Sequence, residues 1–329
     1  MANRITRRRI TVGAALFAAL MVVALLGARS NLVNHVRHVL AFGKQVGWPR
    51  VRLCLCHADE DLTVAREDGL RIAGSLYRGG SDRGPAIVLL HGNTPPGRKL
   101  ALYEVLATKL AEAGYTVLTI DFAGYGESDD PYQSGSLSAL DGSQDVRAAL
   151  SYLTSLETVD RDSIYIIGHS AGATYAFNSG IAEPLVRKIV AIGPPRRDTE
   201  RLLKPRVQEY FWKRAQRTHQ TVYAHPLPQW FSREIWLRGR LRNDMTRHLA
   251  YFSQPDHKPL LLLDADQERQ PDLDFLREYY RKISEPKEYV TIADANHYSN
   301  TSNLGSFDLY DAETIAVTVD HIDRWLRDR

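Results

Sequence analysis

One serine in this sequence stands where nucleophilic chemistry is expected. Ser170 lies between Gly168 and Gly172 and follows the apolar run 164–167, which predicts a strand buried on both faces. A helix-favouring segment comes next, so the serine is expected on a sharp strand-to-helix turn that leaves no room for side chains at its neighbours. Such a turn exposes the hydroxyl and aims the N–H of Ala171 at a developing oxyanion. The predicted chemistry is attack on an acyl carbon, and an ordinary glycine-bounded turn is the alternative.

The segments around Ser170 alternate between strand and helix patterns. A β-hairpin is expected over 62–77, because a Glu-Asp-Gly turn separates two β-rich runs. Buried strands are expected over 86–90, 115–120, 164–169, 188–192, 260–263 and 288–292. Helices are expected over 100–113, 140–156, 173–181, 273–283 and 310–326. This alternation predicts an α/β fold with a doubly wound, mostly parallel sheet.

Composition excludes several classes of protein. With 329 residues, 44% apolar and 25% charged, the chain is an ordinary globular protein, expected to be one domain with an insertion. A net charge of +3 is too small to indicate nucleic-acid binding. Cys54 and Cys56 are too few for a zinc site, and a disulfide across one residue would be strained, so both are expected to be small unbonded apolar residues.

The N-terminus has the pattern of a membrane anchor. Four arginines precede the uncharged run 10–28, whose 19 residues would form a helix about 28 Å long. Residues 1–29 are therefore predicted to be a single-pass anchor or an uncleaved signal. The arginine cluster favours an extracytoplasmic catalytic domain, although further basic residues between 29 and 52 weaken that bias. Residues 30–61 are expected to form an amphipathic connector that rests on the membrane or on the domain.

Four motifs, in their order and spacing, resemble the α/β-hydrolase superfamily, in particular its bacterial serine aminopeptidase-like and lipase-like members. They are His91-Gly92 after a strand, Asp121-x-x-Gly124-x-Gly126-x-Ser128, the turn at Ser170, and Asn296-His297. The resemblance covers residues 62–329. It implies a Ser-acid-His triad without metal or cofactor.

The resemblance also implies the partners of the serine. His297 follows the last strand in a loop of small residues, which is where the family carries its base. The acid is expected three residues after the end of the 260–263 strand. Placing Ala265 where relatives have glycine makes Glu268 the acid, and a tighter turn would make it Asp266 instead. Either carboxylate could hold the imidazole tautomer.

The second oxyanion donor is expected in the loop that begins at His91. The backbone N–H of Asn93 would join that of Ala171, with Thr94 as the neighbouring alternative. In this family Asp121 and Ser128 are expected to tie down the loop that contains them.

The segment 194–258 lies where the fold commonly has a lid. It contains 14 Lys or Arg against 6 Asp or Glu, and it is rich in aromatic residues. It is expected either to roof an apolar cleft near anionic lipid or to be packed helices with a solvated basic face.

Together these features predict a membrane-anchored serine hydrolase that cleaves an ester or thioester of a lipid-like acyl chain. The alternatives are a peptidase or amidase of the aminopeptidase type, and a non-catalytic binding protein on the same fold. Expected partners are a small acyl substrate and, through residues 10–28, a membrane. The sequence leaves the oligomeric state open.

Overall fold

The computed structural model describes residues 32–80, 82–196, 199–242, 245–305 and 307–328. Within these ranges no helix has the length and apolarity needed to cross a bilayer. The span predicted over residues 10–28 lies outside the described residues, as does the rest of the predicted anchor, residues 1–29.

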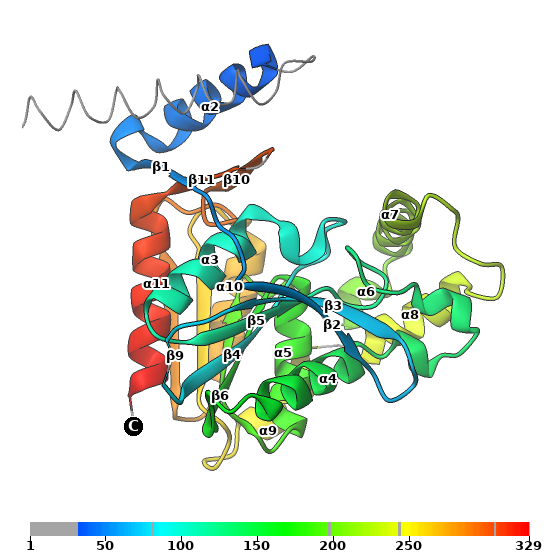
Figure 1. Ribbon diagram of the computed structural model, residues 1–329. Helices are drawn as coiled ribbons and strands as arrows, with labels where there is room; N and C mark the ends of the chain where they lie inside the picture. The colour runs from blue at the N-terminus through cyan, green and yellow to red at the C-terminus, as the bar shows by residue number, and fades with distance from the viewer. Residues whose placement is uncertain (1–31, 81, 197–198, 243–244, 306, 329) are drawn as a thin grey trace, which may run out of the picture.

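An eight-stranded sheet forms the centre of the molecule (Figure 1). Its strands, in sheet order, are β2 (Glu60–Ala65), β3 (Arg71–Tyr77), β5 (Thr116–Ile120), β4 (Gly84–Leu90), β6 (Val159–His169), β7 (Val186–Ile192), β8 (Leu260–Ala265) and β9 (Lys287–Ile292). The pairs β2–β3 and β3–β5 are antiparallel, and every other pair is parallel. The predicted hairpin and the mostly parallel sheet are confirmed.

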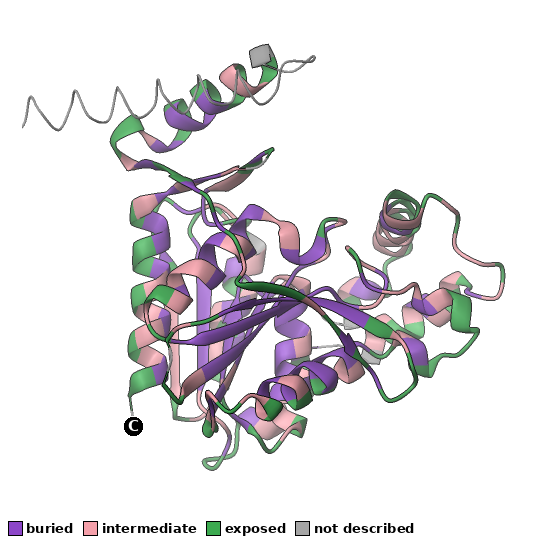
Figure 2. Ribbon diagram, viewed as in Figure 1, coloured by how far each residue is buried: buried purple, intermediate pink, exposed green. Residues whose placement is uncertain are grey.

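Helices cover both faces of this sheet. One apolar cluster joins it to α3 (Ala101–Glu112) and α11 (Ala312–Arg327). The other joins it to α4 (Gly142–Ser155), α5 (Ala171–Ala182) and α10 (Gln270–Arg281). Successive side chains of a strand point to opposite faces, so β4 contributes Ile87 to the first cluster and Val88 to the second. The central strands are therefore buried on both faces (Figure 2).

A second, three-stranded antiparallel sheet was not predicted. It consists of β1 (Val51–Cys54), β11 (Phe307–Asp311) and β10 (Thr301–Leu304). Helix α2 (Leu32–Val46), followed by the short helix η1 (Trp48–Arg50), lies over this sheet (Figure 1). Its side chains Val39 and Phe42 pack against Leu309. Residues 32–54 of the predicted connector thus rest on the domain.

The expectation for the two cysteines is wrong in one respect. Cys54 and Cys56 are joined in a disulfide, and their Cα atoms lie 5.1 Å apart, within the range that a disulfide spans. The chain leaves β1 at Cys54, so the residue between them can bow outward and bring the two sulfurs together. Both residues are buried in an apolar cluster, as expected of small apolar side chains.

The segment between β7 and β8 is helical. It contains α6 (Thr199–Leu202), α7 (Pro205–Tyr223), α8 (Arg233–Arg242), η5 (Met245–His248) and α9 (Leu249–Phe252). Figure 1 shows α7 and α8 on the side of the molecule away from α11. Trp212 packs between Phe231 and Trp236, with ring centroids 5.9 and 6.0 Å away. We call α6, α7 and α8 the cap.

Candidate active site

Ser170 occupies the sharp turn between β6 and α5. Its backbone φ is 53°, in the left-handed region that a residue with a side chain rarely adopts. Its N–H donates to the Ile192 carbonyl at 2.8 Å, which ties the turn to β7. A Cβ at Gly168 would overlap the Gly172 carbonyl, and one at Gly172 would overlap the Leu90 carbonyl. Both glycines are therefore required by close backbone contacts, as the sequence predicted.

His297 and Glu268 face each other from two neighbouring loops. His297 lies between β9 and β10, and its Nδ1 forms a short hydrogen bond with Glu268 Oε1. Glu268 lies between β8 and α10. Gly193, at the end of β7, packs against the pair: a Cβ there would lie 3.3 Å from His297 Nδ1. Because Nδ1 is engaged by the carboxylate, Nε2 is the nitrogen left to exchange a proton.

Asp266, the other candidate acid, does not contact the imidazole. Its carboxylate accepts hydrogen bonds from the backbone N–H groups of Asp294 at 2.9 Å and Ala295 at 3.1 Å. Asp266 therefore fixes the turn that leads to His297. In the structure Glu268 contacts His297, whereas Asp266 contacts the backbone of the turn that precedes His297.

A third carboxylate lies close to this pair. Asp264, in β8, is 3% exposed, and one of its oxygens has no partner among the described residues. Burial raises the pKa of Asp264 to about 7, and the nearby charge of Glu268 acts in the same direction.

Three loops of the site are joined by one chain of buried hydrogen bonds. His169 Nε2 lies 2.7 Å from the carbonyl oxygen of His297, so Nε2 carries the proton and donates it. Burial holds the pKa of His169 well below its usual value, so the ring is neutral and Nδ1 accepts. Nδ1 lies 2.8 Å from the Tyr103 hydroxyl, whose oxygen accepts the Gly92 N–H at 2.6 Å. Tyr103 therefore links the Gly92 loop, the Ser170 turn and the His297 loop.

Sequence reasoning missed Tyr103. It lies inside α3 among apolar residues, where a tyrosine has the appearance of an ordinary core side chain. No local pattern indicates that its hydroxyl reaches two other segments of the chain.

The loop after β4 contains Asn93 and Thr94, the two candidates for the second oxyanion donor. The Thr94 N–H donates to the Gly92 carbonyl at 2.9 Å and is therefore engaged within the loop. In the part of the chain that the structure describes, the N–H groups of Asn93 and Ala171 donate to no protein acceptor. The loop lies against the serine: a Cβ at Gly92 would be 3.0 Å from Ser170 Cβ. The geometry favours Asn93 over Thr94.

His91 connects the loop after β4 to the loop after β5 through its two ring nitrogens. Its Nε2 accepts the Phe122 N–H at 3.0 Å, so its Nδ1 carries the proton and donates to the Gly92 carbonyl at 2.6 Å. Burial lowers the pKa of His91, which keeps the ring neutral, as this pattern requires.

The loop after β5 is tied down by Asp121 and Ser128, as expected. The Asp121 carboxylate accepts the N–H groups of Arg98 at 2.6 Å and Glu127 at 2.9 Å, and it pairs with the Arg98 guanidinium. Ser128 Oγ donates to the Asp121 carbonyl at 2.7 Å and accepts the Ala73 N–H at 2.9 Å.

A cavity of about 620 Å³ lies between the cap and the loops that follow β4 and β5. It reaches Asn93 and Ala171, and its walls combine polar and charged side chains with aromatic ones. The aromatic side chains are Phe122, Tyr125, Tyr132, Tyr175, Phe231 and Trp236. Arg214 of α7 donates to the Asn93 carbonyl at 3.1 Å, so the cap is attached directly to the loop after β4. The volume is that of a site for a small organic substrate.

Comparison with known proteins gives a family match over most of the main sheet and the cap. The sequence model of the alpha/beta hydrolase family matches residues 87–307. A 2-hydroxy-6-oxononadienedioate/2-hydroxy-6-oxononatrienedioate hydrolase of Cupriavidus pinatubonensis is 34% identical over 108 residues, 32% of this chain and 35% of that protein. A thiohydrolase of Arthrinium phaeospermum is 32% identical over 127 residues, 39% of this chain and 40% of that protein. The chain thus aligns with less than half the length of these relatives.

Solved structures extend the likeness to nearly the whole fold. The esterase domain of a Rhodothermus marinus protein superposes with a TM-score of 0.55 at 17% identity, covering 84% of this chain and 98% of that chain. An esterase of Pyrococcus furiosus gives a TM-score of 0.53 at 19% identity, covering 83% and 92%. At these identities the likeness concerns the fold alone.

Proposed function

The chain belongs to the alpha/beta hydrolase family, and on that premise we propose that it is a serine hydrolase that forms an acyl-enzyme on Ser170. The observation that carries the proposal is the pairing of His297 with Glu268, in a chain whose strained turn presents a serine. A binding protein on this fold would have no need of either arrangement.

The proposed reaction has two halves. Ser170 Oγ attacks the acyl carbon while His297 Nε2 takes the hydroxyl proton, and Glu268 stabilises the imidazolium that forms. The oxyanion is bound by the N–H groups of Asn93 and Ala171, and the loss of one such donor costs about 3 kcal/mol of transition-state stabilisation. The intermediate expels an alcohol or thiol, which takes the proton from His297. Water then attacks the acyl-enzyme with the same groups, releases the acid and restores Ser170.

The cavity supports an ester or thioester with an apolar acyl chain as substrate. Its walls include six aromatic side chains against which an acyl chain could pack, and its charged cap side chains, Arg238 and Arg240, are cationic. A peptidase that recognises a free amino terminus would need an available carboxylate. Of the two carboxylates that line the cavity, Asp145 is already bound by Arg66 at 2.7 Å and by the Ala123 N–H at 3.0 Å. The other, Asp141, is the exposed N-cap of α4, so it is the carboxylate that such a peptidase would have to use.

One of the relatives carries the name thiohydrolase, which supports this choice at the level of reaction class. We further propose that residues 10–28 anchor the enzyme in a membrane with its catalytic domain outside the cytoplasm, where lipid-like acyl substrates would be at hand.

Labelling with a fluorophosphonate probe tests the nucleophile. We expect the wild-type chain to be labelled and the Ser170→Ala chain not to be. Ser143→Ala is the matched control, because Ser143 is a serine of α4 that lines the 620 Å³ cavity, and this variant should label normally. If Ser170→Ala labels as strongly as wild type, the proposed mechanism is wrong. Rates on p-nitrophenyl esters of increasing chain length, compared with the matching anilides, then distinguish ester from amide cleavage and define the acyl preference.

A further inference from the structure

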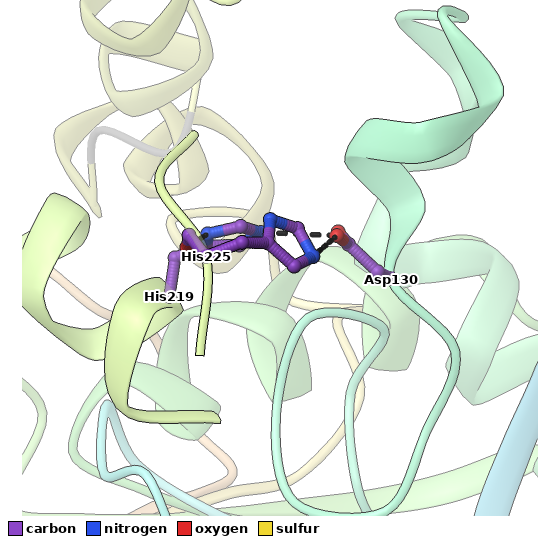
Figure 3. A group of neighbouring side chains, drawn as sticks. All are labelled: Asp130, His219 and His225. Atoms are coloured by element: carbon purple, nitrogen blue, oxygen red, sulfur yellow. Dashed lines mark hydrogen bonds and ion pairs between the residues drawn. The ribbon is translucent and has the colours of Figure 1, made fainter. Parts of the chain in front are cut away.

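Three side chains with metal-binding atoms converge where the cap meets the body of the domain (Figure 3). His219 lies in the last turns of α7, and His225 follows the left-handed residue Ala224, which turns the chain back. Asp130 comes from the loop after β5, just before the short helix η3 (Pro131–Ser134). Asp130 Oδ2 lies 3.1 Å from His219 Nε2 and 3.4 Å from His225 Nε2.

The other nitrogen of each ring is already committed. His219 Nδ1 lies 3.1 Å from the His225 carbonyl oxygen, and His225 Nδ1 lies 3.1 Å from the Pro226 carbonyl oxygen. A carbonyl oxygen can only accept, so both Nδ1 atoms carry protons and donate them. In the neutral rings, both Nε2 lone pairs then face a carboxylate oxygen of Asp130. Three lone pairs directed at one another need a cation or additional protons between them.

A backbone carbonyl that fixes Nδ1–H and leaves Nε2 bare is the usual support of a metal-binding histidine. The carboxylate is held in the same way: Asp130 Oδ1 accepts the Tyr132 N–H at 3.0 Å, and Oδ2 accepts from Gln133 Nε2 at 3.2 Å. The orientation of all three donor groups is therefore determined by their neighbours.

We propose that Asp130, His219 and His225 bind a divalent transition-metal ion of the zinc type. Two imidazole nitrogens and one carboxylate oxygen suit such an ion better than calcium or magnesium, which prefer oxygen ligands. Bonds of about 2.0–2.1 Å in a tetrahedral site place its ligand atoms about 3.3 Å apart, close to the separations of 3.1 and 3.4 Å observed here. A fourth position is left for water or a substrate atom.

The ion would join the cap to the body at the edge of the cavity. His219 lines the 620 Å³ cavity and its side chain is only 2% exposed, whereas Asp130 belongs to the body. Two further bonds cross the same junction, from the Tyr223 hydroxyl to the Ser128 carbonyl at 2.9 Å and from Trp230 Nε1 to the Tyr132 carbonyl at 3.1 Å. The metal is therefore expected to fix the position of α7, and this role does not depend on the function proposed for Ser170.

Zinc binding to the full-length chain, prepared without a histidine tag and stripped with a chelator, tests the proposal. We expect one Zn²⁺ per chain in a competition titration, and a rise in Tm on addition of zinc. Cobalt in place of zinc should give the visible absorption of a four-coordinate site. His225→Gln should weaken zinc binding at least 10-fold and abolish the Tm shift. This variant should fold, because the His225 side chain is 41% exposed.

Two further variants complete the test. Asp130→Asn should also lose zinc affinity. His321→Gln should bind zinc as wild type does, because His321 Nδ1 lies 3.6 Å from Glu288 but belongs to no metal-capable group among the described residues. If the wild-type chain binds no zinc, or if His225→Gln binds it equally well, the cluster is an ion pair between protonated histidines and Asp130, and the proposal fails.

Discussion

Replacing Tyr103 by phenylalanine tests whether the buried hydrogen-bond chain positions the site. The change removes one hydroxyl and leaves two buried groups without partners, the Gly92 N–H and Nδ1 of His169. A buried polar group left unpaired costs about 1–3 kcal/mol, so the free energy of unfolding should fall by about 2–6 kcal/mol. The matched control is Tyr77→Phe, because Tyr77 is buried in the same cluster and its hydroxyl makes no hydrogen bond to the described residues.

The same substitution should slow the reaction that we propose. Gly92 precedes Asn93, the proposed oxyanion donor, and complete loss of one such donor costs about 10²–10³ in kcat. A displaced donor should cost less, so we expect kcat to fall about 10- to 100-fold with little change in KM. Guanidinium unfolding gives the stability, and ester hydrolysis well below the Tm of each variant gives kcat and KM. A folded Tyr103→Phe enzyme with the kcat of Tyr77→Phe would refute the positioning role.

The remaining predictions concern three carboxylates. Glu268→Gln should lower kcat on a p-nitrophenyl ester about 10³- to 10⁴-fold, whereas Asp266→Asn should stay within about tenfold of wild type; equal losses would contradict the assignment of the acid. Asp264 has its pKa raised from 3.8 to about 7 by burial, so between these values the folded chain holds a proton that the unfolded chain has lost. Stability should therefore decrease as pH rises through this window, by up to about 4 kcal/mol at pH 8, and Asp264→Asn should flatten the decrease. Urea unfolding at pH 4.5 and pH 8 measures the change in the free energy of unfolding. If Asp264→Asn shows the same change with pH as wild type, the role assigned to Asp264 is wrong.

The strands of the main sheet were predictable because each is a continuous apolar run between turn residues. The run Leu260–Leu263 needs burial on both faces, and a parallel sheet covered by helices on both sides provides it. The turn at Ser170 was predictable for a similar reason. Gly168 and Gly172 lie where a side chain would overlap the neighbouring backbone, and their being glycine shows this in the sequence itself. In both cases the information is local.

The rest depends on segments that are distant in the chain. β10 reads Thr-Ser-Asn-Leu and has no apolar alternation, and it becomes a strand because β11 pairs with it. The sequence left Glu268 and Asp266 open because the choice depends on how far the turn after β8 carries each carboxylate toward His297. Asp130, His219 and His225 likewise belong to two segments about 90 residues apart, which only the packing of the cap brings together.

The three-stranded sheet determines when folding can be completed while the chain is being synthesised. Among the described residues β1 is the first strand to be synthesised, and its partner there is β11, with Val51 opposite Asp311. Arg50 reaches across this pairing to the Asp311 carboxylate at 2.9 Å, and Asn300 of the His297 loop donates to the same carboxylate at 3.2 Å. A contact this distant in sequence closes late. The apolar face of α2 therefore cannot be buried until β11 has been synthesised. The bond from Asn300 to Asp311, which holds the loop that carries His297, can also form only then.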